Sequence, residues 1–244
     1  MLGNLKEYLK ILLKKLPIPL SKNHMYDIQT QKIIKRVLKE NGNAVDVGCH
    51  VGEIMDLMYN AAPQGNHFGI EPIPSYASFL KEKYATKNNV HIYHLALSEK
   101  EGKTTFNYVK SNPAYSGIKA RKFDRASEKV EVIEVDLARL DDILPKKLPI
   151  NLIKIDVEGA EMLVLRGARK TIDTFHPVVI FEHGLGGADV YGFNPIDVYS
   201  FFDDLNMKVS TMSKYLKSAT ALTQTEFSDH FYQRKDYYYI AYPR

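Results

Sequence analysis

The ten residues Asn43-Ala44-Val45-Asp46-Val47-Gly48-Cys49-His50-Val51-Gly52 predict a buried strand that runs through a glycine turn into a helix. Val45 and Val47 are β-branched, which suits a pleated strand covered on both faces. Gly48 can adopt the positive φ that a tight turn from a strand to a helix requires. Gly52 lacks a Cβ, so a ligand or the sheet can approach the first helical turn, whose free N–H groups can hold a polar ligand. The stretch therefore predicts a ligand-binding turn.

The spacing of the glycines separates three nucleotide-type motifs. The dinucleotide motif G-x-G-x-x-G requires glycine where this chain has His50 and Glu53. A phosphate-binding loop requires Lys and then Ser or Thr after its last glycine, whereas Glu53-Ile54 follows here. The pattern that remains is D-x-G-x-x-x-G, from Asp46 to Gly52, which suits a cationic, ribose-bearing ligand without phosphates. An ordinary strand-to-helix turn is the alternative on these residues alone.

A second acidic residue favours the cofactor interpretation. Glu71 ends a predicted strand, 67–71, and lies 23 residues after Gly48. Dinucleotide folds place a carboxylate about 20 residues on, where it accepts hydrogen bonds from ribose hydroxyls. The expected cofactor-binding residues are therefore Asp46, Gly48, Gly52 and Glu71, together with Ala96 beyond the third strand.

Strands and helices alternate along most of the chain, which predicts an α/β fold with a doubly wound, mostly parallel sheet. The expected strands of this sheet lie at 44–48, 67–71, 90–93, 152–157 and 177–183, with two more around 208 and at 237–241. Two alternating segments, 104–109 and 129–135, predict an antiparallel excursion. The basic loop between them, 110–127, is either a lid or a surface insertion. A single helix is expected over 160–174.

Composition indicates one globular α/β domain, 26–244, in a reducing, cytoplasmic compartment. Of the 244 residues, 45% are hydrophobic and 25% charged, as in ordinary globular proteins. Cys49 is the single cysteine, so no internal disulfide is expected. The net charge of +4 is mild and no basic stripe dominates, so we do not expect a nucleic-acid partner.

The N-terminal segment 1–25 is expected to contain a basic amphipathic helix. Within residues 1–16, leucines recur at helical spacing, lysines fill much of the remainder, and Pro17 ends the helix. The lysines interrupt every apolar run, which excludes a secretory signal. The favoured placement packs this helix on its own domain or on a second subunit, as in a homodimer. The alternative is peripheral contact with an anionic membrane surface.

The second informative segment runs from Leu152 to Glu161 and contains Lys154, Asp156 and Glu158. It reads K-x-D-x-E-G-x-E and is followed, from Leu165, by L-x-G-A. Together with the glycine turn, this segment closely resembles the FkbM family of S-adenosylmethionine-dependent methyltransferases. The resemblance implies a Rossmann-like class I methyltransferase fold, S-adenosylmethionine as cofactor, and O-methylation of a hydroxyl, commonly on a sugar or a secondary metabolite. The resemblance is weaker beyond His183. Substrate choice is the family property that the resemblance implies least for this chain.

Acidic residues at two neighbouring strand ends are the candidates for catalysis. Lys154 lies inside an apolar strand and should pair with an acidic neighbour. Asp156 and Glu158 are the first candidates for a general base, and Glu182 and His183 are the next. Neighbouring strands lie about 5 Å apart, so these four side chains are expected to converge on one acceptor hydroxyl.

Two mechanisms and two further functions stay open at this point. A metal-free general base is favoured, because the motif has no dedicated metal-ligand spacing. In the alternative, Asp156, Glu182 and His183 hold a divalent cation that lowers the pKa of the hydroxyl. The expected acceptor is a hydroxyl-bearing glycan or glycolipid precursor, with a small natural product as the alternative. A non-catalytic cofactor-binding module that acts at a membrane or on a partner would not need the Asp156/Glu158 pair.

Overall fold

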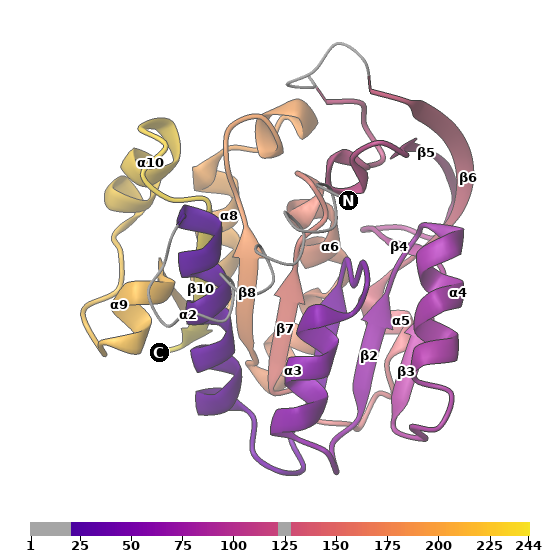
Figure 1. Cartoon of the computed structure of the whole chain (residues 1–244). Coiled ribbons are helices and arrows are strands. Elements are labelled where there is room, and N and C mark those ends of the chain that lie inside the picture. Colours follow the sequence, from indigo (N-terminus) through magenta and orange to yellow (C-terminus); the bar gives the residue numbers. More distant parts are fainter. Residues whose placement is uncertain (1–20, 122–127) are drawn as a thin grey trace.

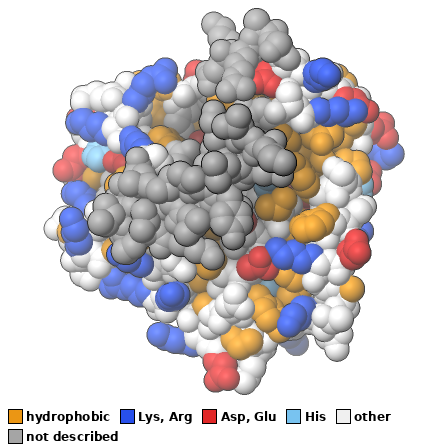
Figure 2. All heavy atoms as spheres, viewed as in Figure 1, with side chains coloured by type: hydrophobic (Ala, Val, Ile, Leu, Met, Phe, Trp, Pro, Cys, Tyr) orange, Lys and Arg blue, Asp and Glu red, His pale blue; other side chains and the backbone are white. Residues whose placement is uncertain are grey.

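The structure is a computed structural model that describes residues 21–121 and 128–244. The basic helix expected within 1–16 and part of the basic loop 110–127 lie outside the described residues. Within the two described ranges, no helix has both the length and the apolar character needed to cross a membrane. Charged side chains of both signs are scattered over the face shown in Figure 2.

A seven-stranded sheet in the order β3-β2-β1-β7-β8-β10-β9 forms the centre of the fold (Figure 1). In that order the strands are β3 Val90–Tyr93, β2 His67–Ile70, β1 Ala44–Val47, β7 Leu152–Ile155, β8 Val178–Glu182, β10 Tyr238–Pro243 and β9 Met207–Thr211. The neighbouring pairs from β3 to β8 are parallel, whereas β10 is antiparallel to both β8 and β9. The expected doubly wound, mostly parallel sheet is therefore confirmed.

Helices cover both faces of this sheet, which gives three layers. One face carries α2 Lys22–Val37, α3 Glu53–Ala61, α4 Pro74–Lys83 and the short α9 Met212–Leu216. The other face carries α5 Leu140–Ile143, α6 Glu161–Gly167, α7 Arg169–Phe175, α8 Pro195–Asp204 and α10 Gln224–Tyr232. We refer to these as the α2 face and the α8 face.

The alternation of strand residues decides which side chains reach which layer. In β7, Leu152 packs in the core of the α2 face, whereas Ile153 and Ile155 pack in the core of the α8 face. Lys154 has the same parity as Leu152 and therefore lies on the α2 face. The same rule places Asp46 of β1 on the α2 face, in register with Lys154.

A second, three-stranded sheet in the order β4-β6-β5 lies near the carboxyl ends of β2 and β3 (Figure 1). Its strands are β4 Ala96–Leu97, β6 Val130–Ala138 and β5 Gly102–Val109. The antiparallel pairing of β5 with β6 confirms the expected excursion. A 3-10 turn, η1 Pro113–Tyr115, follows β5. The chain at Gly117 then returns to Asn107, with which it forms an isolated bridge.

Three helical features differ from the sequence expectation. The single helix expected over 160–174 is divided into α6 and α7 at Ala168. Helix α9 and helix α10, which follow the family signature in sequence, were not expected. Both begin with a threonine N-cap, Thr211 and Thr223, whose side chain accepts a hydrogen bond from the first turn.

Candidate active site

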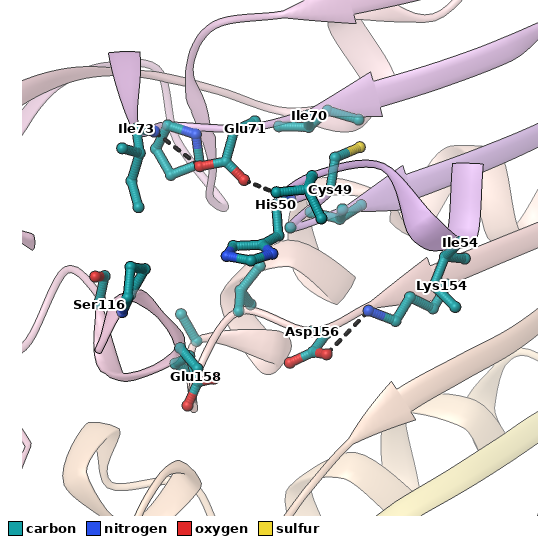
Figure 3. A pocket seen from close by; sticks show the side chains of 18 of the residues that line it. Cys49, His50, Ile54, Ile70, Glu71, Ile73, Ser116, Lys154, Asp156 and Glu158 are labelled. Carbon is teal, nitrogen blue, oxygen red and sulfur yellow. Dashed lines mark hydrogen bonds and ion pairs between the residues drawn. The ribbon is translucent and has the colours of Figure 1, made fainter. Parts of the chain in front are cut away.

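A cavity of about 330 Å³ opens where the strand order reverses, between β1 and β7. Ligands of open α/β sheets bind at such a switch point, outside the carboxyl ends of the strands. The turn from Val47 to Val51 and the segment from Ile70 to Ile73 line one part of the cavity. Asp156, Glu158 and Tyr238 line another part, and α2 and η1 contribute further walls. Figure 3 shows how these side chains surround the open space.

Gly48 joins the two halves of the sheet at this point. Its φ is +85°, which confirms the positive φ expected from the sequence. A Cβ built on Gly48 would lie 2.0 Å from the carbonyl oxygen of Asp156. The amide of Gly48 donates to the carbonyl oxygen of Ile70 over 2.9 Å. Only a residue without a side chain fits between the ends of β2 and β7.

Glu71 is fixed by two backbone hydrogen bonds at the rim of the cavity (Figure 3). The amide of His50 donates to its Oε2 over 2.8 Å, and the amide of Ile73 donates to its Oε1 over 2.9 Å. The side chain is 4% exposed, and burial raises the pKa of Glu71 to about 7 even though both backbone bonds lower it. Each carboxylate oxygen keeps a lone pair for a further donor, such as a ribose hydroxyl.

The other three residues expected at the cofactor have different positions. Ala96 lines the cavity. Asp46 is fully buried below it, and neither of its carboxylate oxygens has a hydrogen-bond partner among the described residues. Burial raises the pKa of Asp46 to about 6, although the charge of Lys154 lowers it. Gly52 lets α3 approach α4, since a Cβ there would lie 2.7 Å from the Tyr84 hydroxyl.

The charged side chains at the cavity suit S-adenosylmethionine. Glu71, Asp156 and Glu158 line it and Asp46 lies beneath it, so carboxylates outnumber the one lysine, Lys154, in this group. Such a set favours a positively charged ligand over the phosphates of a dinucleotide. The free acceptor positions of Glu71 match the two hydroxyls of a ribose.

Asp156 is held as a carboxylate by two donors on the same oxygen. Lys154 Nζ lies 2.9 Å from Oδ2, which confirms the ion pair expected for this lysine, and the Tyr238 hydroxyl donates to the same atom. Burial alone would raise the pKa of Asp156, but the charge of Lys154 and these hydrogen bonds outweigh it and lower the pKa. Asp156 is therefore ionised, and Oδ2 is occupied.

Glu182 and Glu158 complete a cluster of three carboxylates around Asp156. Glu182 lies beside Asp156, and burial followed by the charge of Asp156 raises the pKa of Glu182 well above the ordinary value. Glu158 is paired with Arg121 from the basic loop. Each of the three carboxyl groups offers an oxygen within 4.8 Å of the others, so the cluster could hold a divalent cation.

His183 does not join this cluster, which corrects the expected convergence of four side chains. Glu182 is on the α2 face, and the next residue along the strand points to the opposite face. There the His183 ring stacks on Phe231 and Phe227, with centroid distances of 4.7 and 5.8 Å. Burial lowers the pKa of His183 to about 4, so it is neutral near pH 7. The residues that could hold a cation are therefore Asp156, Glu158 and Glu182, without His183.

Two residues of the site were missed by the sequence analysis. Tyr238 comes from β10, far from Asp156 in sequence, and its signal was the tyrosine run 237–239 at a predicted strand. Arg121 lies in the basic loop, where Nε also donates to the carbonyl oxygen of Gly186 over 2.8 Å. Because this loop has no helical or strand periodicity, the sequence did not indicate which residue Arg121 pairs with.

Comparison with known proteins identifies the family. A sequence model described as the methyltransferase FkbM domain matches residues 46–220, well over half of the chain. The chain belongs to this family, as the signature around Asp156 predicted. The family and its class I fold imply S-adenosylmethionine as the methyl donor, in agreement with the carboxylates at the cavity.

Individual relatives are more distant. Methyltransferase 1 of Beauveria bassiana is 28% identical over 141 residues, which cover 50% of this chain and 57% of that protein. The 2-O-methyltransferase NoeI of Sinorhizobium fredii is 25% identical over 159 residues, which cover 58% of this chain and 63% of that protein. The chain thus spans less than two thirds of the length of these relatives.

A solved structure shows the same fold. It is the methyltransferase FkbM from Methylobacillus flagellatus, with a TM-score of 0.50 and 15% identity. The similarity covers 84% of this chain and 44% of that one. At this identity the comparison supports the Rossmann-like fold alone.

Proposed function

We propose that this protein is an S-adenosylmethionine-dependent O-methyltransferase that acts on a hydroxyl of a glycan or glycolipid precursor. One observation carries the proposal: an ionised carboxylate, Asp156, lines the same cavity as the Gly48 turn and Glu71. Methyl transfer to a hydroxyl needs a cofactor site and a proton acceptor side by side. The family membership and the name of the relative NoeI, a 2-O-methyltransferase, support transfer to oxygen.

In this proposal each residue of the site has a separate task. S-adenosylmethionine supplies an electrophilic methyl group when it is bound. Glu71 accepts hydrogen bonds from the ribose, and the carboxylates around it favour the positive charge of the ligand. Lys154 and Tyr238 hold Oδ2 of Asp156, so Oδ1 is the atom that accepts the proton of the acceptor hydroxyl.

A weak base is sufficient for this step. As an oxygen–methyl bond forms, the hydroxyl becomes strongly acidic, and a carboxylate with a lowered pKa can still accept its proton. Burial and the charge of Asp156 raise the pKa of the neighbouring Glu182 well above its ordinary value, which favours the protonated form of Glu182 beside the ionised Asp156. A divalent cation held by Asp156, Glu158 and Glu182 is the second route, since it would lower the pKa of the hydroxyl directly.

Labelled cofactor tests the function. Calorimetry should detect binding of S-adenosylmethionine and of its product, S-adenosylhomocysteine. Incubation with methyl-labelled cofactor and separated glycan, lipid and RNA fractions should place the label on the glycan or glycolipid fraction. Absence of cofactor binding would refute the proposal. Label found in a small natural product alone would show that this product, and not a glycan or glycolipid, is the acceptor.

A further inference from the structure

A second cavity, of about 220 Å³, lies next to the cofactor cavity along the same edge of the sheet. It is lined by Glu182 at the end of β8, by the glycine loop 184–188, and by Arg234 and Tyr237 from the segment between α10 and β10. Glu182 lines this cavity, whereas its partner Asp156 lines the first one. The Asp156–Glu182 pair therefore lies where the two cavities meet.

The first cavity is too small to hold both the cofactor and the acceptor. At about 330 Å³ it is at the low end of the range, roughly 300–1,000 Å³, of pockets that hold drug-sized ligands. The cofactor alone is a ligand of this size. The second cavity is smaller, which suits a single ring, and its lining residue Glu182 lies beside Asp156, the proposed proton acceptor.

Two of the charged residues that line the second cavity, Arg121 and Asp236, already have partners. Arg121 is paired with Glu158. Both oxygens of Asp236 are engaged, one by the Tyr26 hydroxyl at 2.8 Å and the other by His230 Nδ1 at 2.9 Å. A cavity of this kind does not select a strongly anionic ligand.

Other polar side chains of the second cavity are suited to binding hydroxyl groups. Arg234 is exposed and is one of the residues that line the cavity, and within residues 21–121 and 128–244 its side chain has no hydrogen-bond or ion-pair partner. The carboxyl group of Glu182 also lines the cavity and can accept hydrogen bonds from hydroxyls. Phe231 and Tyr237 supply apolar wall. Planar polar side chains beside aromatic ones present paired donors and acceptors to a ring that carries hydroxyls.

We propose that this second cavity is the acceptor subsite and binds a neutral sugar ring, with Arg234 as a specificity-determining residue. The proposal rests on the O-methyltransferase function and adds the position and the charge of the acceptor. Arg234 and Tyr237 lie beyond residue 220, outside the part of the chain that matches the family. The subsite is therefore built in part by residues outside the matched domain.

The test uses the full chain saturated with S-adenosylhomocysteine, whose binding is first checked by calorimetry. Saturation-transfer NMR then measures the binding of methyl α-glucopyranoside, methyl α-fucopyranoside and methyl α-rhamnopyranoside. Arg234→Ala should weaken the binding of the best glycoside about tenfold, the effect expected for one lost hydrogen-bonding group that carries a charge. Leu185→Trp, which fills the cavity, should abolish it. Lys235→Ala and Leu185→Met are the matched controls and should bind as the wild type does.

Each outcome decides the question. Loss of glycoside binding in Arg234→Ala and Leu185→Trp, with affinity for S-adenosylhomocysteine unchanged, supports the subsite. Failure of all three glycosides to bind the loaded protein overturns it, and so does binding that both variants retain. A protein that does not bind S-adenosylhomocysteine refutes the proposed function itself, which separates the two failures.

Discussion

Gly48 lies directly beneath the main-chain carbonyl of Asp156, with room for no side-chain atom between them. This contact ties the turn after β1 to the end of β7, which carries the proposed proton acceptor. The cofactor turn and the catalytic carboxylate are thus held at one fixed separation.

Gly48→Ala should cost at least about 3 kcal/mol of unfolding free energy, because strained backbone and a steric clash act together. Gly186→Ala is the matched control, since Gly186 has a φ of +96° but no atom within 4 Å of the position that a Cβ would take. It should cost only about 1–2 kcal/mol. Urea unfolding compares the two. Equal losses would show that backbone strain alone restricts position 48.

Glu71→Gln should make the affinity for S-adenosylhomocysteine independent of pH around neutrality. The wild-type carboxyl has a pKa of about 7, so protonation below that pH removes an acceptor, and affinity should fall by up to about tenfold per pH unit. Calorimetry between pH 6 and 8 measures this. A residual slope near pH 6 in the variant would belong to Asp46, whose pKa is about 6. An unchanged slope near pH 7 would refute the role of Glu71.

Asp156→Asn should keep the affinity for the cofactor while methyl transfer falls at least about a hundredfold, as for a lost general base. Calorimetry and turnover of methyl-labelled cofactor measure the two quantities separately. Near-normal turnover would instead assign Asp156 to a structural network with Lys154.

Tyr238→Phe should leave kcat close to normal but move the acidic limb of the pH profile upward. The hydroxyl of Tyr238 lowers the pKa of Asp156, and its removal lets that pKa rise. Tyr239→Phe is the control, because its hydroxyl donates to the carbonyl oxygen of Asp236, away from Asp156. A pH profile that is the same in both variants would exclude the proposed positioning.

Buried Glu161 should make the protein less stable as pH rises. Its Oε1 accepts from the amides of Val157 and Gly159, and burial raises its pKa from 4.5 to about 7. The folded state therefore binds the proton more tightly than the unfolded state does. This contribution is fully present below about pH 4.5 and is lost as pH rises through about 7, by roughly 1–3 kcal/mol. In Glu161→Gln the decline in unfolding free energy from pH 5 to 8 should be smaller. An equal decline would assign the pH dependence to other groups.

Most of the fold could be predicted from local patterns. Alternating strands and helices gave the doubly wound sheet, and period-two segments gave the β5–β6 pair. Helices α9 and α10 were missed because they are short and their caps, Thr211 and Thr223, lack a long periodic run. The break at Ala168 depends on packing between α6 and α7, which periodicity does not report.

The candidate site was predictable where its chemistry is local in sequence. Lys154 and Asp156 are two residues apart in one strand, so their shared face and ion pair follow from strand geometry. His183 was placed wrongly, although the same geometry puts it opposite Glu182. Tyr238 and Arg121 reach the site through long-range pairing, which no local pattern encodes.

Strand β10 has a further consequence for how the protein folds. It is inserted between β8 and β9, although both precede it in the chain. Until it arrives, β8 presents an unpaired edge and Asp156 lacks its Tyr238 partner. We therefore expect catalytic competence to appear only with the final pairing event of the sheet. Pulsed hydrogen exchange during refolding should find the β10 amides protected last, together with the onset of activity.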